Sequence, residues 1–216
     1  MSAMTISDPK ADLLDYLQGA RSVMVWKLDG LAEYDVRRPL TPTGTNLLGM
    51  VKHLARGEFG YFGETFGRPS DAVAPWPHDE QAWQAWALPT ESRESIIGLY
   101  RQACAHADAT IEALPLDAVG QVPWWGDKGE VTLHQVLVHM TAETQRHAGH
   151  ADIVRELIDG AVGLLPGATN IAPSDKAGWA AHRETVERYA QEASRCPLPT
   201  ELVRLPLTLS PSAPNE

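Results

Sequence analysis

Residues 131–160 read VTLHQVLVHMTAETQRHAGHADIVRELIDG, a pattern that predicts one long amphipathic helix. At about 100° of rotation per residue, the axis of its apolar stripe passes through Val136 and Val154. Glu143 and His147 lie about 20° to either side of that axis. Burying a carboxylate and an imidazole is costly unless they are paired or coordinate a metal ion. The flanks of the stripe, about 40–60° from the axis, hold Met140, His150, Leu133, Ala151, Leu157 and His139.

The rest of the chain adds further helices and no convincing strand. Apolar residues at three- and four-residue steps predict helices over about 9–29, 45–66 and 91–114. A weaker, more polar helix is expected over 174–194. Asp8 is the expected N-cap of the first helix, and Thr132 with Gln135 makes a capping-box pattern ahead of the long one. The predicted fold class is therefore all-α, a four-helix bundle with an additional C-terminal helix.

Pro- and Trp-rich segments join these helices. Residues 67–90 form a long connection in which a short helix is expected at 79–87, and connections this long tend to be functional or disordered. Residues 196–216 are Pro-rich, which predicts an extended or disordered tail. We therefore expect a helical bundle domain over residues 1–195 and a tail over 196–216.

The bulk composition excludes several classes of protein. A net charge of −10 over 216 residues disfavours nucleic-acid binding, and no apolar run approaches the roughly 20 residues that span a bilayer. The N-terminus lacks the pattern of a signal peptide, so we expect a cytoplasmic protein without membrane contact. Cys104 and Cys196 are too few for a disulfide framework, and Cys104 lies in a helical pattern as a small core residue.

Glu143 and His147 stand four residues apart, so they project from one face of the helix on successive turns. Such an i, i+4 pair of oxygen and nitrogen ligands commonly holds a divalent cation, and a catalytic site adds a third protein ligand. His53, close to an apolar stripe in the second helix, is the best candidate, with His106 as the alternative. The remaining histidines outside the long helix's stripe, expected to face solvent, are His134, His78 and His182.

Simpler interpretations stay open at this point. Glu143 and His147 alone could form a buried ion pair, and a lone histidine such as His53 is usually a satisfied core or boundary residue. His139 and Glu143 are also four residues apart, so a site shifted by one turn is an alternative, as is participation of His150.

The segment HMTAETQRHAGHADIVRELIDG resembles the last core helix of the DinB/YfiT-like superfamily of metal-binding four-helix bundles. The upstream segments KLDGLAEYDVRRPLTPTGTNLLGMVKHLARGEFGYF and VPWWGDKGEVTLHQVLVHM resemble its actinobacterial branch. The resemblance implies a ligand set of His53, Glu143 and His147. Many members carry His-x3-His on the last core helix, whereas Glu-x3-His is typical of the members similar to mycothiol-dependent maleylpyruvate isomerase. Arg155 and Asp159 match the family pattern away from the metal face.

The resemblance implies a thiol-dependent S-transferase or isomerase that acts on a small molecule with a low-molecular-weight thiol such as mycothiol. The resemblance also implies a divalent metal ion as cofactor, with zinc expected and nickel as the alternative. Because related bundles pair, a homodimer is expected as well. A metal-dependent hydrolase and a non-catalytic, stress-associated metal-binding protein are the alternatives. The tryptophans expected to wall the mouth of the site are Trp76, Trp83, Trp86, Trp124 and Trp125.

Overall fold

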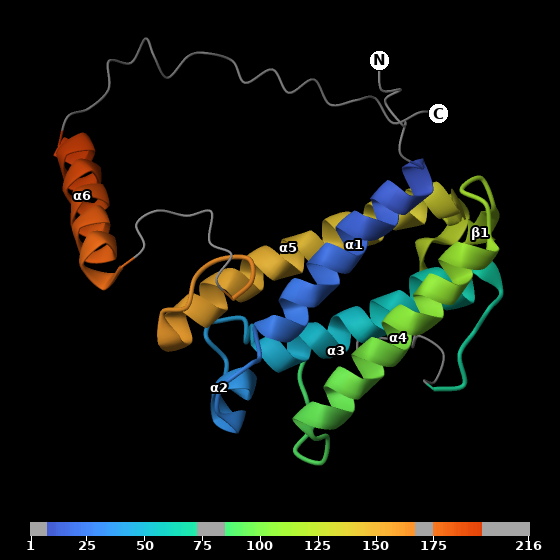
Figure 1. The fold of residues 1–216 in the computed structure, drawn as a ribbon, viewed down its shortest axis with the longest axis horizontal. Helices are drawn as coiled ribbons and strands as arrows, with labels where there is room; N and C mark the ends of the chain where they lie inside the picture. The colour runs from blue at the N-terminus through green and yellow to red at the C-terminus, as the bar shows by residue number, and fades with distance from the viewer. Residues whose placement is uncertain (1–7, 73–84, 167–174, 196–216) are drawn as a thin grey trace, which may run out of the picture. The chain divides into compact units, whose positions relative to one another are not determined.

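The computed structural model describes residues 8–72, 85–166 and 175–195 (Figure 1). Its contacts divide the chain into two units, Met1–Thr169 and Asn170–Glu216, and each is described by itself. In the second unit, the additional C-terminal helix is present as α6 (Lys176–Arg195), which has no buried residue. The predicted tail, 196–216, lies outside the described residues, as does most of the short helix expected at 79–87.

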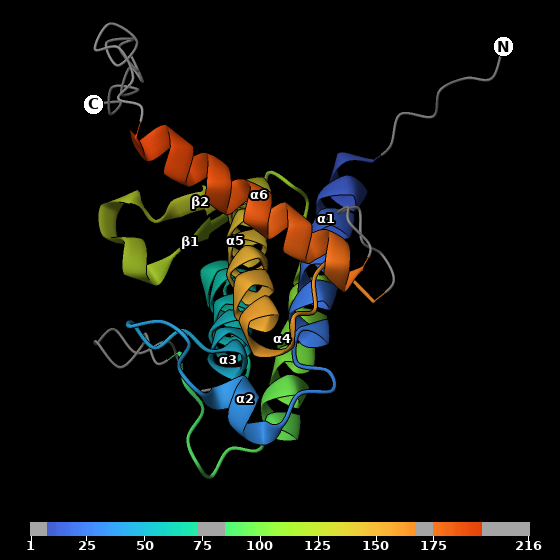
Figure 2. The same cartoon turned by 90° about the vertical axis from the view of Figure 1, so that its left-hand side faces the viewer.

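Four long helices build the first unit. They are α1 (Pro9–Trp26), α3 (Leu47–Glu58), α4 (Arg93–Ala113) and α5 (Leu133–Asp159). Helix α1 packs on α5, α3 packs on α4, and α3 also contacts α5 (Figures 1 and 2). The predicted four-helix bundle is therefore confirmed. None of the described helices is both long and apolar enough to cross a membrane.

Local sequence signals define where the long helices begin and end. The Asp8 side chain accepts a hydrogen bond from the Lys10 backbone N–H, as an N-cap does. Thr132 and Gln135 form the predicted capping box at the start of α5. At the other end of α5, Gly160 adopts a left-handed conformation with φ 75°, which glycine adopts without steric cost.

Helix α3 changes its winding where the sequence becomes rich in glycine. It continues as a π-helical turn, η1 (Phe59–Gly63), and a 3-10 turn, η2 (Glu64–Phe66), so the predicted end near Phe66 is correct but its regular winding is not. At Gly60, a Cβ atom would lie 2.7 Å from the ring of Trp124, so any other residue would force the ring to shift. Such π-helical turns occur frequently at functional sites.

Two short elements and one small helix escaped the sequence patterns. Strands β1 (Val119–Gln121) and β2 (Glu130–Thr132) pair antiparallel, with Gly120 opposite Val131, and helix α2 spans Glu33–Arg37. Three-residue strands and a five-residue helix are too short for a periodic signal. The hairpin between the strands carries a 3-10 segment, η4 (Pro123–Lys128), and lies at one end of the bundle (Figure 2).

Near the C-terminal end of α5, the residues that are buried differ from those that the helical wheel placed on the apolar face. His150 is exposed and Leu157 is 62% exposed, whereas Ala151 and Val154 are buried. The prediction treated α5 as packing through one face, but α5 contacts both α1 and α3, so its buried residues are not those of a single stripe. Arg155 is buried as well. It donates hydrogen bonds to the backbone carbonyls of Lys27 and Asp29 and pairs with Asp159, so it ties α5 to the end of α1.

Candidate metal centre

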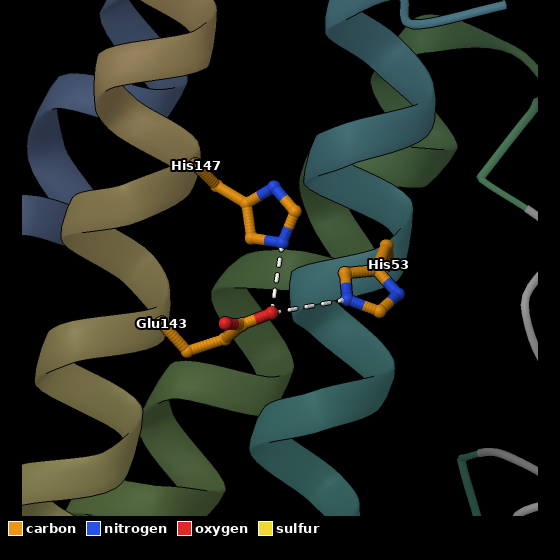
Figure 3. A group of neighbouring side chains, drawn as sticks. All are labelled: His53, Glu143 and His147. Carbon is orange, nitrogen blue, oxygen red and sulfur yellow. Dashed lines mark hydrogen bonds and ion pairs between the residues drawn. The ribbon is translucent and has the colours of Figure 1, made fainter. Parts of the chain in front are cut away.

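His53 on α3 and the pair Glu143 and His147 on α5 come together in the seam between the two helices (Figure 3). Nε2 of His147 lies 2.9 Å from Oε1 of Glu143, and Nε2 of His53 lies 3.7 Å from the same oxygen. One ligand atom from each residue falls within 4.8 Å of the other two. The structure therefore brings together all three residues named from the sequence, each of them partly buried.

Burial and charge prepare the three side chains as ligands. Burial lowers the pKa of His53 below its ordinary value, and the charge of Glu143 only partly opposes this. Burial, helped by the charge of His53, also lowers the pKa of His147. Burial alone would raise the pKa of Glu143, but the charge of His147 and the hydrogen bonds from Arg146 and His147 lower it. At neutral pH the cluster is two neutral imidazoles and one carboxylate.

Arg146 is a member of the cluster that the sequence did not reveal. Its Nε and Nη2 donate to the two oxygens of Glu143, each over 3.1 Å. The guanidinium holds the carboxylate in one orientation while its own side chain stays 60% exposed. The three-residue spacing from Glu143 to Arg146 could have indicated this contact, because it puts both on neighbouring turns.

The other histidines take different positions. His106, the alternative third ligand, lies on α4, and its Nε2 is 2.7 Å from the backbone oxygen of Arg68. It is not among the three grouped residues, and neither is His139 or His150. His134 and His182 are exposed, as expected. His78 lies outside the described residues.

Cys104, on α4, is partly buried, so the interpretation as a small core residue holds only in part. It lines an open cavity of about 610 Å³ between α1 and α4. Burial, with a smaller contribution from the charge of Glu58, raises the pKa of its thiol to about 12. Only the thiolate is a strong nucleophile, so this cysteine is poorly reactive at neutral pH.

We therefore expect Cys104 in the folded protein to be alkylated by iodoacetamide at pH 8 at least about tenfold more slowly than in the unfolded chain, because burial raises the pKa of its thiol and the smaller thiolate fraction outweighs the higher nucleophilicity of that thiolate. Peptide mass spectrometry of samples quenched at successive times gives the rate. The same protein in guanidinium chloride serves as the control. Equal rates in the two states would show that the thiol is not suppressed.

The sequence over residues 12–160 matches the family model described as mycothiol-S-transferase. The chain belongs to the mycothiol-S-transferase family. The matched range begins within α1 and extends past the end of α5, so it includes all three residues of the cluster. Among curated proteins, none matches the chain.

Solved structures support the same fold for this family member. YfiT from Bacillus subtilis, described as a probable metal-dependent hydrolase with an unusual four-helix bundle topology, is 18% identical, with a TM-score of 0.55. The match covers 74% of this chain and 94% of YfiT. A conserved protein from Enterococcus faecalis is 16% identical with a TM-score of 0.52, over 72% of this chain and 100% of that one. At such identities these likenesses establish the fold alone, a four-helix bundle.

Proposed function

We propose that this protein is a metal-dependent S-transferase, in which His53, Glu143 and His147 hold one divalent ion and an external low-molecular-weight thiol is joined to an electrophilic small molecule. The observation that carries the proposal is the convergence of three ligand atoms between α3 and α5 in a chain of the mycothiol-S-transferase family. The family description makes mycothiol the first thiol to test.

The donor set fits a divalent ion. Two imidazole nitrogens and one carboxylate oxygen are ligands of catalytic zinc sites, which keep one position open for substrate. Ligand atoms about 2.1 Å from a tetrahedral ion stand about 3.5 Å apart. Nε2 of His53 lies 3.7 Å from Oε1 of Glu143, whereas Nε2 of His147 lies 2.9 Å from the same oxygen, so this second pair would have to open slightly around an ion. Two neutral imidazoles and one carboxylate leave a divalent site with a net positive charge. Zinc is the proposed ion, and nickel is the alternative with similar ligand preferences.

A divalent ion at this place would supply Lewis acidity, which deprotonates a coordinating thiol at neutral pH. The chain's own residues orient the proposed ligands and favour their metal-binding protonation states. Arg146 keeps the Glu143 carboxylate oriented, and the partial burial of His53 and His147 favours the neutral rings that a metal ion binds. The thiol sulfur forms a bond to the electrophilic carbon as the bond to the leaving group breaks, and the thiol proton goes to solvent.

The nucleophilic sulfur comes from outside the chain in this scheme. Cys104 is on α4, outside the cluster of His53, Glu143 and His147, and its raised pKa keeps it protonated. This is why we propose a thiol cosubstrate rather than a covalent intermediate on Cys104.

Metal analysis and turnover test the proposal together. Protein loaded with zinc and dialysed should retain about one ion per chain by mass spectrometry of the metal, as a three-ligand site does. It should then accelerate conjugation of mycothiol with 1-chloro-2,4-dinitrobenzene. Hydrolysis of p-nitrophenyl acetate without thiol would instead identify a metal-dependent hydrolase. Retained metal without turnover of any substrate would identify a non-catalytic metal protein, and absence of metal would refute the ligand assignment.

A further inference from the structure

A cluster of four rings lies beside the candidate metal centre. The ring cluster consists of Tyr61 on η1, Trp124 and Trp125 on η4, and His139 on α5. The centroid of the Tyr61 ring is 4.7 Å from that of His139 and 5.0 Å from that of Trp124. Trp125 lies 5.1 Å from His139, within the range of favourable aromatic contacts. All four side chains are only partly buried, so their rings are not sealed in the core.

The backbone is shaped to hold these rings in place. Because Gly60 has no Cβ, the Trp124 ring packs directly against its backbone, and Trp124 Nε1 donates to the Tyr61 hydroxyl over 3.4 Å. The pairing of β1 with β2 brings the hairpin back to the start of α5, where the Leu133 N–H donates to the Ala118 carbonyl. Two segments separated by some sixty residues thus meet at η1.

The ring cluster adjoins the proposed metal ligands. His139 precedes Glu143 by one turn of α5, on the same face. The charge of Glu143 also contributes, after burial, to raising the pKa of Tyr61, which places the phenol within electrostatic reach of the carboxylate. Burial lowers the pKa of His139, so at neutral pH the four rings form an uncharged surface.

We propose that the ring cluster is the binding site for the electrophilic substrate and that it selects a flat, unsaturated group, which it binds by ring stacking. The substrate class rests on the proposed function, because the electrophile must lie next to the thiol. A cationic group would be disfavoured, since a divalent ion with Glu143 and the Arg146 guanidinium leave the neighbouring site positive. Neutral or anionic planar electrophiles can stack on the rings and are not repelled by the positive metal site.

Binding of a non-reactive ring tests this without any turnover. The probe is 1,3-dinitrobenzene, a neutral planar molecule that quenches tryptophan fluorescence. The protein is to be titrated with it in the presence and absence of zinc. His139→Ala should weaken its binding about threefold to tenfold, since one stacking partner is lost. His139→Phe should keep the wild-type affinity because the ring remains. His134→Ala, an exposed histidine on the same helix, is the matched control and should have no effect.

Kinetics then separate the two proposals. With mycothiol, His139→Ala should raise KM for 1-chloro-2,4-dinitrobenzene about threefold to tenfold and leave kcat/KM for iodoacetamide within about twofold, because only the planar substrate stacks. Metal content should stay at the wild-type level in every His139 variant. Equal losses for both electrophiles, or loss in His139→Phe as in His139→Ala, would overturn the stacking site. Absence of turnover with normal dinitrobenzene binding would refute the transferase while leaving the ring site standing.

Discussion

Replacing His147 by alanine should abolish stable divalent-metal binding and, with it, conjugation of mycothiol. Of the two proposed histidine ligands, His147 lies closer to Glu143, at 2.9 Å, and its ring is partly buried. Outer-shell changes around metal sites weaken affinity by about 10–100-fold, so loss of a direct ligand should exceed about 100-fold. Competition with a chelator of known zinc affinity measures the change.

Three further variants identify which residues form the ligand set. His53→Ala and Glu143→Gln should each lose metal as His147→Ala does, and the Gln variant keeps the shape of the side chain. His106→Ala should keep the metal ion, because His106 contacts the Arg68 carbonyl rather than the cluster. If His139→Ala lost the metal and His147→Ala kept it, the site would be shifted by one turn. Wild-type metal content in all of them would leave the cluster as a hydrogen-bonded group without an ion.

Breaking the buried ion pair between α1 and α3 should cause the largest loss of stability. Arg21 donates to both oxygens of Glu58 over 2.7 and 2.6 Å, and Glu58 is fully buried. Burial lowers the pKa of Arg21, but the charge of Glu58 and the hydrogen bonds to Glu58 and Asp108 together raise it, so the guanidinium stays charged. Arg21→Met leaves the carboxylate without a partner and should cost about 3–5 kcal/mol. The melting temperature should fall by roughly 10 °C.

The pH dependence and a double variant make this prediction specific. Burial raises the pKa of Glu58, and a raised carboxyl pKa makes the folded state more stable at low pH, where the group is protonated. Arg21 lowers the pKa of Glu58, so this pKa rises further in Arg21→Met, and the variant protonates Glu58 at a higher pH than the wild type does. The loss of stability in Arg21→Met should therefore shrink as pH falls toward the ordinary carboxyl range. Arg21→Met combined with Glu58→Met should recover most of the loss, because no buried charge remains. Arg188→Met, at an exposed pair on α6, is the control and should change stability by less than about 1 kcal/mol. Chemical denaturation at several pH values measures all four proteins.

The sequence by itself determined what depends on neighbours a few residues apart. The four long helices follow from apolar spacing, and the capping of α5 follows from Thr132 and Gln135. The pairing of Glu143 with His147 follows from the helical period, since residues four apart always share a face. For the same reason His134 was correctly expected to face solvent. Each of these features involves a single helix.

Tertiary structure decided the features that depend on contacts between different elements, namely the position of the third ligand candidate and the contacts of the rings. The sequence favoured His53 and left His106 as the alternative; the packing of α3 against α5 brings His53 to the pair, while His106 on α4 contacts the Arg68 carbonyl. No local pattern encodes which helix lies beside which, because that depends on packing over the whole core. The hairpin that carries Trp124 to Tyr61 was also missed, because three-residue strands become stable only through long-range pairing. The long helix thus supplies two ligand candidates by its own periodicity, and the bundle supplies the third and the rings beside them.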